Sequence, residues 1–301
     1  MGLIDRALGN GIRVSAWTFE ELYGRDSKFL DGLDSRKQAY VAEIPSDTRL
    51  WTAKPEVIRK VPSKKSKGRP KRIPRVKRNP RACEVRNLLK YSSKFQKQSW
   101  QRYRIKDTEK GPEIWEVKWL HVWRKTEDKL PSKQPTLVVA RNVRTGEVKY
   151  FISNQVVGRG DVTLRFLLRV AFSRWVIEAC FRLAKEELGM DHFEVRGWRC
   201  IHRHYYVTAL SYLLCSRIRL QLDPDKSRGL TVEQVRRSLN AYLASYHLPA
   251  SLRVEAFEKE LRDQDYYQKR NAQAKKSHTK TRIKQYHKLG IDVDKIKSCI
   301  T

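Results

Sequence analysis

We predict an α/β fold from three patterns in this 301-residue sequence. Residues 12–44 contain an alternating run, a helical segment and a second alternating run, which is the pattern of a βαβ unit. Strand-like alternation dominates residues 100–154, and two long apolar helices are expected within residues 161–222. Residues 223–301 are basic and have a moderate helical period, so a mostly helical C-terminal region is expected.

The βαβ unit places one acidic side chain where ligands usually bind. We expect a strand over residues 12–18 that stops at Glu20, a helix over residues 27–35, and a parallel strand over residues 39–44. Ligands collect at the carboxyl ends of parallel strands, so Glu20 is expected at a functional rim of the sheet. A helix cap or a merely exposed charge is the alternative interpretation of this residue.

The stretch from residue 59 to residue 78 contains eleven Lys or Arg and no acid. Interspersed proline and glycine make a packed core impossible, so a flexible basic arm is expected. Within it, Lys67, Arg69 and Lys71 form part of a KGRPK run that resembles the minor-groove hook of chromatin proteins. A generic phosphate-binding run is the alternative, and both interpretations predict contact with DNA.

The strand-like region contains a hairpin and several tryptophans. The hairpin is expected over residues 137–152, with its turn at Thr145 and Gly146. Trp115, Trp119 and Trp123 alternate along one strand side. We interpret them as sheet packing rather than as a platform for stacking bases.

A single helix of about seven to eight turns is expected from Asp161, as its N-cap, to a stop at Gly189. Most of its circumference is apolar, so burial on most sides is expected. One polar stripe interrupts that surface, at spacings of four, four and three residues: Arg174, Glu178, Arg182 and Lys185. A solvated stripe with one ion pair between Arg174 and Glu178 is the alternative to a functional face.

The charge balance predicts a polyanionic partner. The formal net charge is +31 and the sequence pI is about 10.1, which makes nucleic acid the default partner. No apolar run reaches the about eighteen residues that a membrane-spanning helix needs, and residues 1–10 lack the apolar core of a signal peptide. We expect a soluble cytoplasmic protein that does not bind membranes.

Cysteine and histidine spacing argues against a zinc site. The five cysteines show no paired spacing of the zinc type, so they are expected to be reduced, with Cys180, Cys200 and Cys215 in the helical core. His202 and His204 are two residues apart on a predicted helix and therefore point to different faces.

The stretch RWVIEACFRLAKEELGMDHFEVRGWRCIHRHYYVTALSYLL, which begins at Arg174, resembles the C-terminal block of DDE-type transposases of bacterial insertion sequences. The resemblance is strongest to the insertion-sequence 701 family and extends to the first fifty and last thirty-five residues. Arg174, Glu178 and Lys185 match three positions of a spaced Tyr, Arg, Glu, Lys signature, and Ala171 stands at the Tyr position. The run FEELYG, which contains Glu20, stands where the family carries Phe-Asp-Glu-Leu-Tyr-Gly.

The resemblance implies a partial ribonuclease-H-like fold with five segments. Residues 1–58 would form part of the core, and residues 59–98 a basic linker. Residues 99–157 would form a β-rich insertion, and residues 158–222 a catalytic-helix region that completes the core. Residues 223–301 would form a helical, basic tail.

The resemblance also implies DNA transposition by endonuclease and strand-transfer chemistry. In this chemistry carboxylates hold two Mg²⁺ or Mn²⁺ ions about 4 Å apart. Glu20 and Glu178 would then be the second and third catalytic, metal-binding acids. Contacts with DNA phosphates are expected from two groups of cations, one on the glutamate helix and one in the tail: Arg174, Arg182 and Lys185, and Arg270, Lys280 and Arg282.

The first catalytic acid has no counterpart, because Asp5 is the only acid before Glu20 and it lies in a helical segment. The expected explanation is an N-terminally truncated or frameshifted copy, or one half of an enzyme that an upstream protein half completes. Glu at position 20 instead of Asp also moves the ligand oxygens by one methylene. Whether the chain alone is active is therefore left open.

The implied partner is double-stranded DNA, both transposon ends and target, within the bacterial nucleoid. A homo-oligomer is a further expectation, because transposases usually act as multimers on paired ends. A non-catalytic DNA-binding remnant of a transposase is the alternative function. A basic RNA-binding protein of ribosomal type is a third interpretation, supported by the pI alone.

Overall fold

The computed structural model describes residues 1–58, 73–78, 80–133, 135–223, 229–247 and 249–299. It contains two compact units, Met1–Arg174 with Thr279–Thr301 (unit 1) and Trp175–His278 (unit 2). The predicted basic arm lies largely outside the described residues, and so do Lys67, Arg69 and Lys71.

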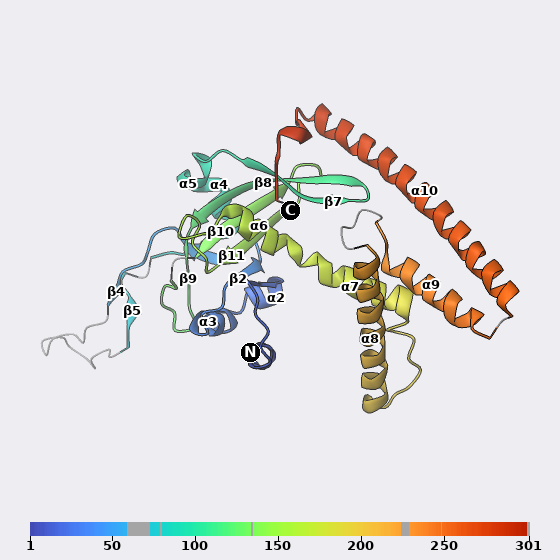
Figure 1. Cartoon of the computed structure of the whole chain (residues 1–301). Coiled ribbons are helices and arrows are strands. Elements are labelled where there is room, and N and C mark those ends of the chain that lie inside the picture. The colour runs from blue at the N-terminus through green and yellow to red at the C-terminus, as the bar shows by residue number, and fades with distance from the viewer. Residues whose placement is uncertain (59–72, 79, 134, 224–228, 248, 300–301) are drawn as a thin grey trace, which may run out of the picture. The chain divides into compact units, whose positions relative to one another are not determined.

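Unit 1 is built on a mixed sheet that has seven strands in the described part of the chain (Figure 1). The strand order is β1-β2-β11-β10-β8-β7-β12, in which β1 and β2 are parallel and the strands from β2 through β7 pair antiparallel. The bounds are β1 Trp17–Phe19, β2 Tyr40–Ile44, β7 Gln101–Thr108, β8 Gly111–His121, β10 Thr136–Asn142, β11 Val148–Ser153 and β12 Lys297–Ser298.

Shorter elements surround this sheet. The helices that lie wholly in unit 1 are α1 Gly2–Gly9, α2 Glu21–Gly24, α3 Ser27–Ser35, α4 Val85–Tyr91, α5 Ser93–Gln96, α6 Leu164–Ser173 and the 3₁₀ turn Val293–Lys295. A small sheet contains β3 Arg49–Trp51, β6 Cys83–Glu84 and β9 Trp123–Arg124, and a two-stranded ribbon contains β4 Val57–Ile58 and β5 Arg75–Val76.

The sheet is covered on both faces, as the alternation of side chains along β2 shows. Tyr40, Ala42 and Ile44 pack into a core that includes Leu30 and Leu33 of α3. Val41, on the opposite face, packs into a second core with Leu167 and Leu168 of α6. Successive side chains of a strand point to opposite faces, and the four apolar residues of β2 are therefore buried by both layers, while Glu43 is partly exposed.

The predicted βαβ unit is confirmed, since β1 pairs parallel with β2 and α3 connects them. The first strand is shorter than predicted, because Ile12 and Val14 are exposed and precede the paired residues. The hairpin of β10 and β11 is confirmed, with Gly146 at φ +74° in its turn.

The β-rich segment shares the main sheet with the βαβ unit, because β11 pairs antiparallel with β2. The strands of this segment therefore continue the same sheet beyond β2. Trp115 is buried, and its ring lies 4.9 Å from that of Phe172 in α6, which confirms the packing role predicted for it.

The prediction of one long helix over residues 161–189 was wrong. Two helices occupy this range, α6 and α7 (Trp175–Leu188), and Arg174 between them keeps helical dihedrals of φ −56° and ψ −35°. The N-cap of α6 is Thr163 rather than Asp161, because the Thr163 hydroxyl accepts a hydrogen bond from the Phe166 amide at 3.1 Å.

The predicted burial of the helix on most of its sides is confirmed for α6 but is wrong for α7. α6 buries four residues against the sheet, whereas Ala184 is the one buried residue of α7. The apolar side chains of α7 are about half exposed: Trp175 47%, Val176 55%, Ile177 50% and Phe181 49%.

Unit 2 is helical, as predicted. It contains α7, α8 (Trp198–Leu222), α9 (Val232–Ser245) and the first part of α10 (Ala250–Lys288). A small core forms around Cys215, Val232 and Val235, and Thr231 closes the start of α9 with a capping box. No described helix meets the length and apolarity that a membrane span requires.

The cysteines carry no disulfide, but the expected burial is only partly right. Cys215 is buried, whereas Cys180 is partly exposed and Cys200 is exposed. Cys299, beside β12, is also buried, and burial raises its pKa to about 11.

The close approach of α2 to β2 depends on Gly24. An added Cβ at Gly24 would lie 1.9 Å from the carbonyl oxygen of Glu43. We therefore expect Gly24→Ala to lower the free energy of unfolding by about 1–3 kcal/mol, because the backbone must shift. Chemical denaturation measures this change. Gly9→Ala is the control, since its Cβ meets nothing within 4 Å, and equal stability of both variants would contradict the prediction.

Candidate functional site

Glu20 lies at the carboxyl end of β1, directly before α2. The turn that carries it is fixed by packing, since the ring of Phe19 meets that of Phe29 in α3 edge-on, at 4.9 Å between centroids. The Glu20 side chain is 53% exposed, and its Oε2 lies 3.6 Å from Nη1 of Arg174. The structure thus brings together a predicted catalytic acid and a predicted DNA-binding cation within unit 1.

The other predicted residues of the glutamate helix lie in unit 2. Glu178, Arg182 and Lys185 are exposed on α7, and Arg182 Nη1 lies 3.7 Å from Glu186 Oε2 one turn later. Glu20 and Glu178 therefore belong to different units. Their convergence on one site stays a prediction.

The described residues do not by themselves assemble a complete metal site. No group of three or more His, Cys, Asp or Glu side chains placed to hold a metal ion occurs in the described ranges. Hard divalent cations need several oxygen ligands, and the charged group that lies near Glu20 is the guanidinium of Arg174. Binding of Mg²⁺ or Mn²⁺ by Glu20 and Glu178 stays a prediction as well.

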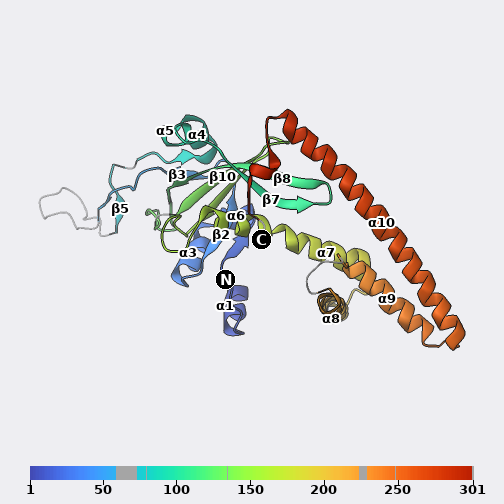
Figure 2. The same cartoon turned by 45° about the horizontal axis from the view of Figure 1, so that its top comes forward.

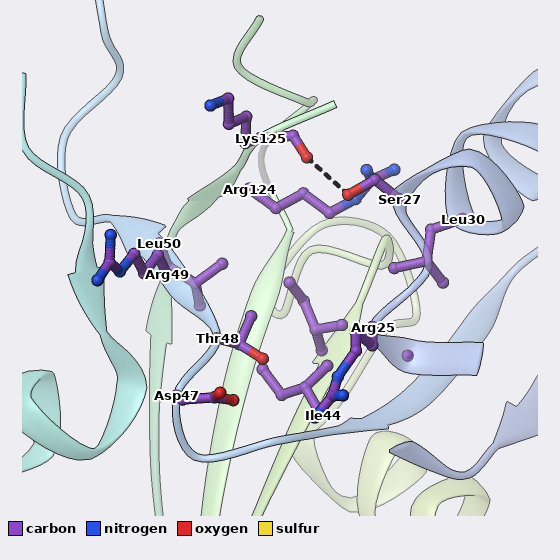
Figure 3. Close-up of a pocket in the computed structure, with 12 residues that line it drawn as sticks. Arg25, Ser27, Leu30, Ile44, Asp47, Thr48, Arg49, Leu50, Arg124 and Lys125 are labelled. Carbon is purple, nitrogen blue, oxygen red and sulfur yellow. Dashed lines mark hydrogen bonds between the residues drawn. The ribbon is translucent and has the colours of Figure 1, made fainter. Parts of the chain in front are cut away.

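A pocket of about 410 Å³ opens beyond the carboxyl end of β2, next to Gly24 (Figure 3). Its polar lining is mainly cationic: Arg25, Arg49, Arg124 and Lys125, with Asp47, Ser27 and Thr48. The Ser27 hydroxyl donates a hydrogen bond to the Lys125 carbonyl at 3.1 Å and so joins α3 to the loop after β9. Arg124 is paired with Asp31 and Asp34, and the other three cations against one acid in the lining favour an anionic group over a cation.

Arg124 is the most deeply buried charged side chain described in this pocket wall, since it is only 5% exposed. Its Nη2 donates to Asp31 Oδ1 at 2.5 Å and to Asp34 Oδ2 at 2.9 Å. Asp34 also accepts a hydrogen bond from Asn154 Nδ2, and Asn154 Oδ1 accepts one from the Tyr40 amide. This network joins α3, β9, the start of β2 and the residue that follows β11.

Sequence reasoning missed this network. Asp31 and Asp34 lie three residues apart on α3, and each directly follows a buried leucine, Leu30 or Leu33. This spacing could have indicated two carboxylates on one side of the helix, next to its buried face. Arg124 follows an apolar run and gives no periodic signal of its own.

The tail residues have different environments. Arg270 and Lys280 are exposed on α10. Arg282, which was predicted to bind DNA, donates from Nη1 to the Thr108 hydroxyl and to the Gly111 carbonyl, both at 3.0 Å. It therefore holds the helix to the β7–β8 hairpin, a role that the sequence analysis did not anticipate.

Replacing Arg124 should destabilise unit 1. Arg124→Leu leaves two carboxylates without their cation, and we expect a loss of about 2–3 kcal/mol, less than the about 3–5 kcal/mol of a fully buried pair. Asp31 and Asp34 are 28% and 21% exposed, so solvent screens part of the cost. Chemical denaturation tests this.

The control for this substitution is Arg36→Gln, because Arg36 pairs with the exposed Asp5 at 2.6 Å. An exposed pair contributes little to stability. If Arg36→Gln lowers the denaturation midpoint as much as Arg124→Leu, the central role of the Arg124 network is refuted.

Comparison with known proteins fits the position of Glu20. Residues 1–112 match the family described as DDE superfamily endonuclease, a range that contains Glu20 and ends before Glu178. No curated protein matches the chain. The match supports the predicted DDE superfamily, at a coarser level than the insertion-sequence 701 family, and with it a transposase-like nuclease that acts on DNA.

Proposed function

We propose that the chain is a DNA transposase of a bacterial insertion sequence, of the 701 family type, with a partial ribonuclease-H-like fold. The observation that carries the proposal is the position of Glu20. It lies at the carboxyl end of a parallel strand, where catalytic carboxylates of α/β folds collect, and within the range that matches the endonuclease family. The proposed reaction is cleavage of DNA and its transfer to a target strand.

Glu20 and Glu178 are the proposed acidic residues, and Mg²⁺ or Mn²⁺ is the proposed cofactor. When bound, such ions activate the attacking oxygen and stabilise the leaving oxygen of a phosphoryl transfer. Arg174 would orient the Glu20 carboxylate, and its planar guanidinium also suits a DNA phosphate. Arg182 and Lys185, exposed on the same helix as Glu178, would bind the backbone of the substrate.

A third carboxylate is part of the proposal, and we propose that it is supplied by an upstream protein half. β1 is the terminal strand of the main sheet in the described part of the chain, so its outer edge can accept another strand. A strand added there in parallel with β1 would end beside Glu20.

Metal-dependent nicking of supercoiled plasmid tests the proposal, with the chain alone and with the protein encoded directly upstream. We expect Glu20→Gln and Glu178→Gln to lower nicking by about 10²-fold or more, because several kcal/mol of charge stabilisation depend on the metal. Binding to duplex DNA should persist in both variants.

Each variant has a neighbouring control. Glu21→Gln follows Glu20 in the chain, and Glu186→Gln lies on the same helix as Glu178. Both controls should nick like the wild type. A wild-type protein that binds DNA but never nicks it, with or without the upstream protein, would show a non-catalytic DNA-binding remnant instead.

A further inference from the structure

The C-terminal part of α10 is anchored to the edge of the main sheet. Tyr286 is 1% exposed, and its hydroxyl accepts a hydrogen bond from the Ile114 amide at 3.2 Å and donates one to the Pro112 carbonyl at 3.3 Å. Arg282 binds the tip of the same hairpin, as described above. Figure 2 shows β7 and β8 beside this end of the helix.

Two further contacts fix this arrangement. Gly111, at φ +100°, lies so close to the helix that an added Cβ would be 3.0 Å from the Cα of Thr279. After the helix, β12 pairs with β7, and the Cys299 amide donates to the Arg104 carbonyl at 2.8 Å. One face of residues 279–288 is therefore held against the sheet.

The opposite face of this helical segment carries a row of lysines. Lys280, Lys284 and Lys288 are exposed and lie four residues apart, so they share one side at steps of about 6 Å along the axis. Arg282 and Tyr286, which face the sheet, lie about half a turn away from that row. The anchoring contacts thus determine which side the lysines present.

The row differs from an ordinary solvated helix face, because no acid occurs between residues 266 and 291. Earlier in α10, cations pair with acids one turn away, as Arg262 does with Glu258 at 3.6 Å and Lys269 with Asp265 at 2.6 Å. The next acid after the row, Asp292, lies 3.0 Å from Lys295. The helix thus supplies no carboxylate one turn away from any of the three lysines.

We infer that Lys280, Lys284 and Lys288 form a ridge that binds the phosphates of duplex DNA. The inference rests on the proposed function only in taking DNA as the substrate. A stacking platform for single strands needs exposed aromatic rings, and Tyr286, the aromatic residue of this segment, is buried. Insertion into a membrane surface needs an exposed apolar helix face, and here Tyr286 and Ile291 pack with Ile114.

Salt dependence of DNA binding tests the ridge in the full chain. The triple variant K280Q/K284Q/K288Q should reduce the slope of log K against log salt by about 2.7, because each phosphate contact contributes about 0.9. We expect binding of a duplex of unrelated sequence to weaken by about 10–10²-fold at 0.1 M salt. Thermal unfolding should not change, since the three side chains are exposed.

The matched control removes the same charge elsewhere in unit 1. Lys28, Lys54 and Lys133 are exposed and far apart in the sequence, so K28Q/K54Q/K133Q reports the general effect of lowering net charge. The ridge is refuted if both triple variants change the slope equally, or if the ridge variant keeps the wild-type slope. Equal or stronger loss of binding to structured RNA or to anionic vesicles would also refute it as a surface for duplex DNA.

These outcomes are separate from those of the proposed function. Plasmid nicking by a protein whose ridge variant keeps its salt slope would overturn the ridge alone. A ridge variant with the expected slope in a protein that never nicks would overturn the enzyme and leave the ridge supported.

Discussion

The arrangement of unit 1 depends on β2, because both faces and both edges of this strand are covered. β1 pairs with one edge and β11 with the other, while α3 and α6 contribute to the two cores that flank it. Each residue of a strand so enclosed loses contact with water on two sides, and hydrophobic burial is the main favourable term in folding. The position of Glu20 follows from this strand, since β1 has no other pairing partner in the described sheet.

The local parts of this fold were predictable from the sequence. The βαβ unit and the β10–β11 hairpin have short connections, and alternation together with turn residues identifies each of them. The antiparallel pairing of β11 with β2 was not predictable in the same way, because about a hundred residues separate the two strands. The break between α6 and α7 also escaped prediction, since the apolar side chains of the sequence continue from the first helix into the second.

In the candidate site, too, local features were predictable from the sequence and long-range contacts were not. Glu20 could be predicted because a strand end is a local feature, and the resemblance of the FEELYG run pointed to the same residue. Arg124 could not, because its role depends on two aspartates about ninety residues away and on burial. Arg282 shows a second limit. Its contact with DNA stays a prediction, and the basic segment around it gave no sign of its hydrogen bonds to a hydroxyl and a carbonyl of the protein itself.

The burial of Cys299 has a consequence for the chemical environments in which the C-terminal strand can stay in place. Oxidants attack the thiolate, and a thiol with a pKa of about 11 remains protonated at neutral pH. Its sulfur is also enclosed by the core beneath α6, so reagents in solution have little access to it. The attachment of α10 to the sheet should therefore survive oxidative stress that modifies exposed thiols such as those of Cys83 and Cys200.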